Sequence, residues 1–199
     1  MDEAGRGSWA GPVVAGVCAL RKGMTYDFSS LLDDSKKLSP KKRKEIFTMI
    51  KKSISDGLCF GGIGIISSEI IDHVGIREAN RLAMQEAMRQ VISQVGKNFK
   101  LIKIDGRDNY AFNDINSKKI EYIIRGDTFV PEIQAASILA KVSRDSLMEE
   151  LAKIYPCYGF EKHKGYGTRL HEELLSAYLP SDVHRKSYAP IKKLILNGE

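Results

Sequence analysis

Apolar and polar positions follow two different periods along the chain, and the two alternate. Short apolar runs bounded by turn residues predict strands over 13–20 and 58–66. Between them, Ser39-Pro40 is typical of a helix start, with a capping hydroxyl before a proline at the first helical position, so we expect a helix over 40–54. Small and apolar residues recur at steps of three and four from Ile76 to Val95, which predicts an amphipathic helix over 75–95.

The second half of the chain repeats this alternation. Apolar runs at 101–106 and 120–127 predict two further strands, each ending at an aspartate, Asp105 and Asp127. A long helix over 131–154 follows, and Tyr155-Pro156 ends it before two short helices at 169–178 and 190–196. The pattern predicts an α/β layer structure, with one domain over 1–154 and a small C-terminal helical subdomain over 155–199.

Composition fits an ordinary globular protein with a basic excess. The chain has 199 residues, of which 43% are hydrophobic, and a formal net charge of +6. The basic residues crowd two stretches: Lys36, Lys37, Lys41, Lys42, Arg43 and Lys44, and then Lys162, Lys164, Arg169, Arg185 and Lys186. Such clusters indicate an anionic partner such as nucleic-acid phosphates, although a lysine-rich helix face exposed to solvent explains the first stretch equally well.

The cysteines and the lengths of the apolar runs indicate the cellular compartment in which the protein is expected. Cys18, Cys59 and Cys157 are odd in number and widely spaced, which favours neither a disulfide framework nor a zinc site. No apolar stretch reaches the roughly 18 to 20 residues that span a bilayer. We expect a soluble, cytoplasmic monomer without a membrane partner. The histidines lack ligand spacing, and we expect hydrogen-bonding or packing roles for His73, His163, His171 and His184.

Four acids are the candidates for chemistry. Asp2 and Glu3 precede the first glycine-rich turn, and Asp105 and Asp127 close two predicted strands. Ligands collect at strand ends in open α/β sheets, and carboxylates that converge there repel one another unless a divalent cation joins them, so the set predicts a Mg²⁺ or Mn²⁺ site. Consecutive strand residues face opposite sides of a sheet, which makes Asp2 a safer ligand than Glu3.

The motifs occur in an order that resembles one enzyme family. They are DEAGRG at 2–7 with AGP at 10–12, DSKKL at 34–38, IDG at 104–106, GD at 126–127, ASILAKVSRD at 136–145, HKGYGT at 163–168 and HRKSY at 184–188. This series is similar to that of bacterial ribonuclease HII across nearly the whole chain.

The resemblance implies a fold and an activity. The fold would be a mixed sheet of the RNase H type flanked by helices. The activity would be endonucleolytic hydrolysis of the RNA strand in RNA–DNA hybrids, and incision 5′ of ribonucleotides embedded in duplex DNA, leaving a 3′-hydroxyl and a 5′-phosphate. Two Mn²⁺ or Mg²⁺ ions would be held by the acids that match the family's catalytic set: Asp2, Glu3, Asp105 and Asp127.

The resemblance also implies substrate contacts. The backbone of Gly5, Arg6 and Gly7 matches the family's reader of the ribonucleotide 2′-hydroxyl, and Tyr166 matches the tyrosine that stacks on the next deoxyribose. Other positions match the phosphate side of the site: Ser35, Lys36 and Asn80. Separately, Ser137 and Lys141 lie four apart on one predicted helix face, which fits either a grip on one phosphate backbone or an ordinary surface pair.

Two departures from the family pattern leave alternatives open. Ser8-Trp9 stands where proline and leucine are usual, and only Met1 precedes Asp2, where family members have several apolar residues of a central strand. Either further residues precede the sequence or the first strand is incomplete. The competing functions are another nuclease or strand-transfer enzyme of the same fold, and a non-catalytic hybrid-binding module. The 2′-hydroxyl reader and Tyr166 argue against the first of these. The second is favoured only if an incomplete first strand abolishes metal binding.

Overall fold

The strands of this protein lie between residues 2 and 123. The computed structural model describes residues 1–21, 23–33, 35, 37–96, 100–112 and 120–197, so the candidate Lys36 lies outside it. Strands β1 (Asp2–Ala4), β2 (Val13–Ala19) and β3 (Phe60–Ile66) pair antiparallel in that order, whereas β4 (Ile102–Asp105) and β5 (Ile120–Ile123) pair parallel.

Met1 connects the two groups of strands. Its amino group donates to the carbonyl of Lys103 at 2.7 Å, and the Asp105 N–H donates to the carbonyl of Met1 at 3.0 Å. One residue bonded to both neighbours of its partner is the parallel pattern, so these two hydrogen bonds place the three-stranded and the two-stranded groups side by side as a mixed arrangement.

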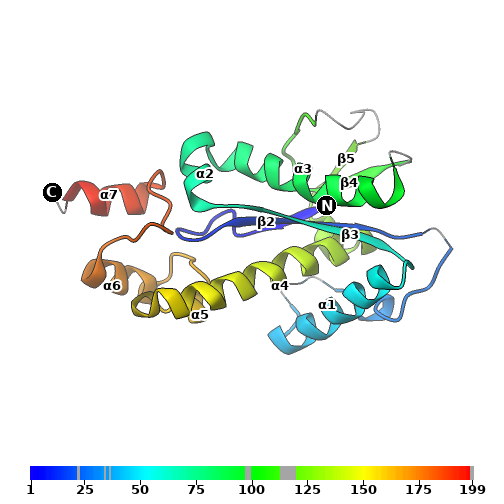
Figure 1. The fold of residues 1–199 in the computed structure, drawn as a ribbon, viewed down its shortest axis with the longest axis horizontal. Helices are drawn as coiled ribbons and strands as arrows, with labels where there is room; N and C mark the ends of the chain where they lie inside the picture. The colour runs from blue at the N-terminus through cyan, green and yellow to red at the C-terminus, as the bar shows by residue number, and fades with distance from the viewer. Residues whose placement is uncertain (22, 34, 36, 97–99, 113–119, 198–199) are drawn as a thin grey trace.

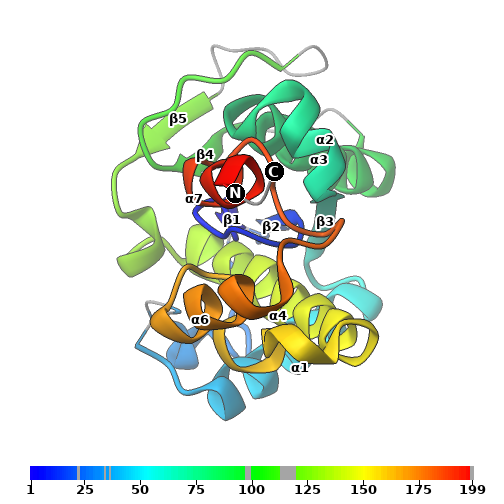
Figure 2. The same cartoon turned by 90° about the vertical axis from the view of Figure 1, so that its left-hand side faces the viewer.

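Helices cover both faces of this sheet. They are α1 (Pro40–Ser55), α2 (Ser68–Val74), α3 (Ile76–Val95), α4 (Pro131–Ile154), α5 (Phe160–His163), α6 (Arg169–Tyr178) and α7 (Ala189–Asn197), with 3₁₀ turns η1 (Ser29–Leu31), η3 (Gly126–Thr128) and η4 (Pro156–Tyr158). Figure 1 shows α2 and α3 above the strands and α4 and α1 below them, and the turned view in Figure 2 has the same order.

Glycines in the strands let the two long helices approach the sheet. A Cβ at Gly64 would lie 1.9 Å from the carbonyl oxygen of Ala83 in α3, and one at Gly16 would lie 2.2 Å from that of Ala136 in α4. Gly64 pairs with Ala15 and Gly16 is the next residue of β2, so these two contacts are on opposite faces. Each face therefore buries its own apolar cluster, one with α3 and one with α4 and α1.

The helices predicted from periodicity and caps are confirmed within one or two residues, but the strand predicted over 120–127 is too long. β5 ends at Ile123, and Arg125 has a left-handed backbone with φ of 57°, which ends extended structure. Asp127 consequently lies in the 3₁₀ turn η3 rather than at a strand end. Helix α2, which has seven residues and is capped by the hydroxyl of Ser67, was not predicted from the sequence.

The C-terminal segment packs on the N-terminal loop. Helices α6 and α7 lie at one end of the molecule in Figure 1. Their apolar residues share a third cluster with Ala10 and Met148, and backbone hydrogen bonds run from Gly11 to Val183 and from Arg185 to Trp9. Within the described ranges, no helix is long and apolar enough to cross a membrane.

Candidate active site

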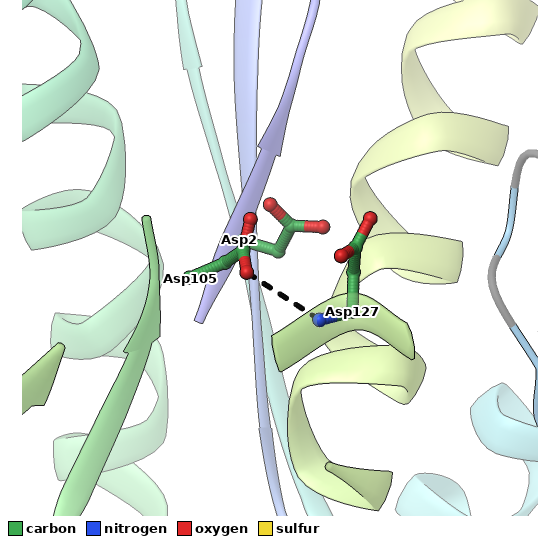
Figure 3. A group of neighbouring side chains, drawn as sticks. All are labelled: Asp2, Asp105 and Asp127. Carbon is green, nitrogen blue, oxygen red and sulfur yellow. Dashed lines mark hydrogen bonds between the residues drawn. The ribbon is translucent and has the colours of Figure 1, made fainter. Parts of the chain in front are cut away.

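Three carboxylates from distant parts of the chain meet at one point. Asp2 in β1, Asp105 at the end of β4 and Asp127 in η3 each offer an oxygen, and these oxygens all lie within 4.8 Å of one another (Figure 3). The N–H of Asp127 donates to Oδ1 of Asp105 at 3.4 Å, which ties η3 to the end of β4. Asp2 and Asp127 are only 6% and 3% exposed, whereas Asp105 is half-buried, so the group is largely buried and reaches the surface at Asp105.

Strand alternation separates Glu3 from this group. Asp2 pairs with Gly16 and therefore faces α4, whereas Glu3 pairs with Ala15 and faces α3. On that side Glu3 accepts a hydrogen bond from the buried Asn80, whose amide also donates to the Tyr110 hydroxyl at 2.9 Å. The structure thus brings three of the four predicted acids together and places Glu3 beside them on the other face.

Burial and mutual repulsion make this a site that favours cations. Desolvation, with the neighbouring charges of Glu3 and Asp105, raises the pKa of Asp2 to about 7. Burial likewise raises the pKa of Glu3. The hydroxyl of Ser137 and the N–H of Glu3 offset part of this by hydrogen bonding to the Asp2 carboxylate. Clustered, buried carboxylate oxygens are the ligands that Mg²⁺ and Mn²⁺ prefer, so the residues present fit a divalent metal.

Helix α4 extends from the acids to Tyr166. Ser137 contacts Asp2 and also lies 2.9 Å from the hydroxyl of Ser35, which places the predicted Ser35 at the edge of the acid group. One turn further on, Lys141 pairs with Asp145 at 2.8 Å, and its Nζ lies 5.7 Å from the centre of the Tyr166 ring. Three of the predicted substrate residues thus line one face of α4 or its edge.

The loop at Gly5, Arg6 and Gly7 is held from beneath by buried arginines. Gly5 has φ of +87°, and a Cβ there would lie 1.8 Å from Nε of Arg144. The carbonyl of Arg6 accepts hydrogen bonds from Arg185 at 3.0 Å and from the Tyr188 hydroxyl at 2.6 Å. Apart from Gly7 itself and its two chain neighbours, no heavy atom of the described residues lies within 4 Å of a Cβ added at Gly7, so the loop is open on that side.

The side chain of Arg6 is itself paired. It forms an ion pair with Asp108 and lies 3.6 Å from Oε1 of Glu3. The sequence analysis did not anticipate Asp108, which carries no motif signal beyond its place three residues after Asp105.

The second basic stretch is divided: Lys162, Arg169 and Lys186 are exposed, whereas Arg185 and Lys164 are not free surface charges. Arg185 is fully buried and donates to the carbonyls of Gly11 and Arg6, because a guanidinium can satisfy several loop carbonyls at once. Lys164 forms an ion pair with Glu149 at 3.0 Å. Arg144 was also missed as a structural residue: it is fully buried and donates to the carbonyls of Pro12, Ala10 and Lys164. From the sequence alone, an arginine is expected to lie at the surface, because arginines are mostly exposed.

A sequence model of one family covers almost the whole chain. The model described as ribonuclease HII matches residues 1–191. The chain belongs to the ribonuclease HII family. Ribonuclease HII of Chlamydia pneumoniae is 48% identical over 194 residues, which cover 98% of this chain and 84% of that protein. Ribonuclease HII of Chlamydia trachomatis serovar L2 is 43% identical over 198 residues, covering 100% of this chain and 84% of that protein.

Solved structures share the fold of this ribonuclease HII family member. The ribonuclease HII in a PCNA complex from Archaeoglobus fulgidus superposes with a TM-score of 0.69 at 25% identity, covering 93% of this chain and 90% of that one. Ribonuclease H2 from Pyrococcus horikoshii OT3 gives a TM-score of 0.71 at 22% identity, covering 98% and 95%. The fold is therefore RNase H-like, and the predicted α/β class is confirmed.

Membership of the ribonuclease HII family makes the chain a ribonuclease H enzyme, one that cleaves the RNA strand of RNA–DNA hybrids. Enzymes of this family use divalent metals, and the group of Asp2, Asp105 and Asp127 provides a fitting set of ligands here.

Proposed function

We propose that this enzyme, besides cutting the RNA strand of hybrids, incises 5′ of single ribonucleotides embedded in duplex DNA and leaves a 3′-hydroxyl and a 5′-phosphate. The observation that carries the proposal is the convergence of Asp2, Asp105 and Asp127 on the side of α4 that also presents Ser137 and Lys141. This chemistry would serve ribonucleotide excision repair and the removal of RNA primers in DNA replication, in the cytoplasm of the cell.

The acids would hold two Mg²⁺ or Mn²⁺ ions. When bound, such ions activate water and stabilise the charge that develops on the leaving 3′-oxygen. Hydrogen bonds within the protein orient two of the acids. Ser137 orients the Asp2 carboxylate, and the N–H of Asp127 orients the Asp105 carboxylate. Glu3 completes the proposed set from the α3 side, where the amide of Asn80 orients its carboxylate.

Recognition of the ribonucleotide would come from the loop at Gly5, Arg6 and Gly7. Because the loop is open at Gly7 and anchored behind by Arg185, its backbone can approach a 2′-hydroxyl closely. Tyr166 is 36% exposed beside Lys141, which suits a ring that stacks on the deoxyribose following the ribonucleotide.

The phosphate contacts form a separate part of the proposal. We assign them to Ser35, Lys36, Ser137 and Lys141. We further propose that residues 155–199 form a C-terminal helical subdomain that contributes Tyr166. The enzyme would act as a monomer. Asn80, which resembles a phosphate-side position, is fully buried and bonded to Tyr110 and Glu3, so its part in this proposal is to position Glu3.

The test is cleavage of a labelled DNA duplex that contains one ribonucleotide. We expect incision 5′ of the ribonucleotide that requires Mg²⁺ or Mn²⁺, and no incision of the same duplex made entirely of DNA. A product with a 5′-hydroxyl, or equal cutting of the all-DNA duplex, would contradict the proposed activity.

A further inference from the structure

Three of the four histidines form a buried cluster beneath Tyr166. Nε2 of His171 lies 3.1 Å from Nε2 of His184, and the rings of His163 and His171 stack with centroids 4.3 Å apart. His171 and His184 are fully buried. The cluster joins three segments: α5, which carries His163, α6, which carries His171, and the loop before α7, which carries His184.

The hydrogen-bond partners fix which ring nitrogen carries the proton. The N–H of Ser181 donates to Nδ1 of His184 at 3.0 Å, so neutral His184 has its proton on Nε2. Nδ1 of His171 lies 3.0 Å from the carbonyl oxygen of Tyr166, which only accepts, so that nitrogen carries the proton and Nε2 of His171 accepts. His184 therefore donates to His171, and the bonds run in one direction from Ser181 to Tyr166.

We propose that this chain of hydrogen bonds, from Ser181 through His184 and His171, is a positioning device for Tyr166 and thereby for recognition of the ribonucleotide's neighbour. The inference rests on the proposed function, because it assigns a support to the side chain that would stack on the substrate sugar. The carbonyl of Tyr166 accepts from His171 and from the N–H of Thr168 at 2.8 Å. These two bonds hold the backbone from which the exposed ring extends toward Lys141.

The chain of hydrogen bonds requires both His171 and His184 to be neutral. A second proton on His171 would place two N–H groups against each other across 3.1 Å, and one on His184 would oppose the N–H of Ser181. Desolvation, with the other histidines of the cluster, lowers the pKa of His171 and of His184 to about 4. His163 faces His171 from α5, where Glu161 and Lys164 are its charged neighbours.

The same geometry argues against a metal role for these imidazoles. In His171 and His184 the hydrogen bonds described above use every ring nitrogen, and His163 is committed in the same way. Its Nδ1 accepts from the N–H of Gly165 at 3.2 Å, and its Nε2 donates to the carbonyl of Tyr158 at 2.7 Å. Among the described residues, the acids Asp2, Asp105 and Asp127 are the group with metal-ligand geometry.

One test reads the protons directly in the wild-type protein. Long-range ¹H–¹⁵N correlation spectra at neutral pH distinguish the two neutral tautomers of each histidine. We expect the Nδ1–H form for His171 and the Nε2–H form for His184 and His163. A His171 with its proton on Nε2 would overturn the inference, because that ring could not donate to Tyr166.

A second test separates the hydrogen bond from the ring. His171→Phe keeps an aromatic ring without donors, whereas His171→Asn keeps an N–H near the position of Nδ1. On the single-ribonucleotide duplex we expect kcat to fall by tenfold or more in His171→Phe and to stay within about threefold of wild type in His171→Asn, because displacement of a positioning group by ~1 Å costs on the order of 100-fold. Mn²⁺ affinity should be unchanged in both variants.

Two further variants make the outcomes distinct. Ile191→Val removes a methylene group from the same C-terminal core but leaves the hydrogen bonds of the histidines in place. It should lower the melting temperature and leave kcat unchanged. Tyr166→Ala sets the scale for complete loss of the ring. If Tyr166→Ala is slow while His171→Phe cuts like wild type, or if His171→Asn is as slow as His171→Phe, the positioning chain is wrong and the proposed function stands. If Tyr166→Ala cuts like wild type, the proposed role of Tyr166 is wrong and the inference falls with it.

Discussion

Asp2 and Glu3 are consecutive residues of β1, yet their carboxylates face opposite sides of the sheet. Asp2 faces α4, where Ser137 contacts it, and Glu3 faces α3, where Asn80 contacts it. We therefore expect the two acids to contribute unequally to the proposed metal site, whose candidate ligands Asp2, Asp105 and Asp127 converge on the α4 side.

Metal affinity should reveal this inequality. We expect Asp2→Asn to weaken Mn²⁺ binding by at least about tenfold, since it removes one charge from the converging group, and Glu3→Gln to weaken it clearly less. Titration calorimetry of the two variants at equal pH measures the difference. Equal losses in both would show that Glu3 is as central a ligand as Asp2.

The two glycines that flank Arg6 should respond differently to alanine. Gly5→Ala places a Cβ against the buried Arg144 in a left-handed backbone and should lower the free energy of unfolding by about 2 kcal/mol or more. Gly7→Ala meets open space, so the fold should keep its stability while cleavage at a ribonucleotide falls. Thermal melting and single-turnover cleavage of both variants test this, and full activity in a stable Gly7→Ala would remove the loop from substrate recognition.

Lys141 should contribute to phosphate binding. With a catalytically inactive variant as background, Lys141→Ala should make the slope of log affinity against log salt shallower by about one unit. Lys153, exposed further along α4 and paired with Glu150, supplies the control, and Lys153→Ala should leave the slope unchanged. Identical slopes for both variants would return Lys141 to an ordinary surface pair with Asp145.

The buried histidines should make the fold sensitive to acid. The pKa of His171 and of His184 lies at about 4 in the folded protein, below the ordinary 6.5, so the unfolded chain binds more protons between these values. The free energy of unfolding should therefore fall as pH drops from 6.5 toward 4, by on the order of 2 kcal/mol per histidine.

Variants isolate this effect from other groups, since the raised pKa of Asp2 acts in the opposite direction. The loss between pH 6.5 and 4 should be smaller in His171→Phe than in wild type, and unchanged when the exposed His73 is replaced in His73→Gln. Denaturant unfolding at a series of pH values measures it. A parallel pH dependence in wild type and His171→Phe would show that His171 takes up its proton in the folded state without cost.

Local signals predicted the frame of this molecule well. The hydroxyl of Ser39 and the proline after it mark the start of α1, apolar periodicity predicted α3, and Tyr155-Pro156 predicted the end of α4. The expectation that Asp2 is a safer ligand than Glu3 came from strand alternation alone, and the structure groups the acids accordingly.

What escaped the sequence depends on tertiary partners. Arg144 and Arg185 are buried because loop carbonyls from residues more than a hundred positions away accept their hydrogen bonds. His171 and His184 lie 13 residues apart and come into contact because α6 and the loop before α7 pack together in the fold. Arginine is not a residue type that indicates a left-handed backbone, so the sequence did not predict the turn at Arg125. The strand predicted over 120–127 is therefore too long.

The converging carboxylates should be needed for the cleavage step itself and not merely for the shape of the surface. The measurement is single-turnover cleavage and equilibrium binding of a duplex with one ribonucleotide, at saturating Mg²⁺, for Asp105→Asn and Asp127→Asn. We expect both variants to bind the duplex with nearly wild-type affinity and to fail to cut it, because each loses a metal-ligand charge while the phosphate contacts remain. Near-normal turnover in both variants would contradict this expectation.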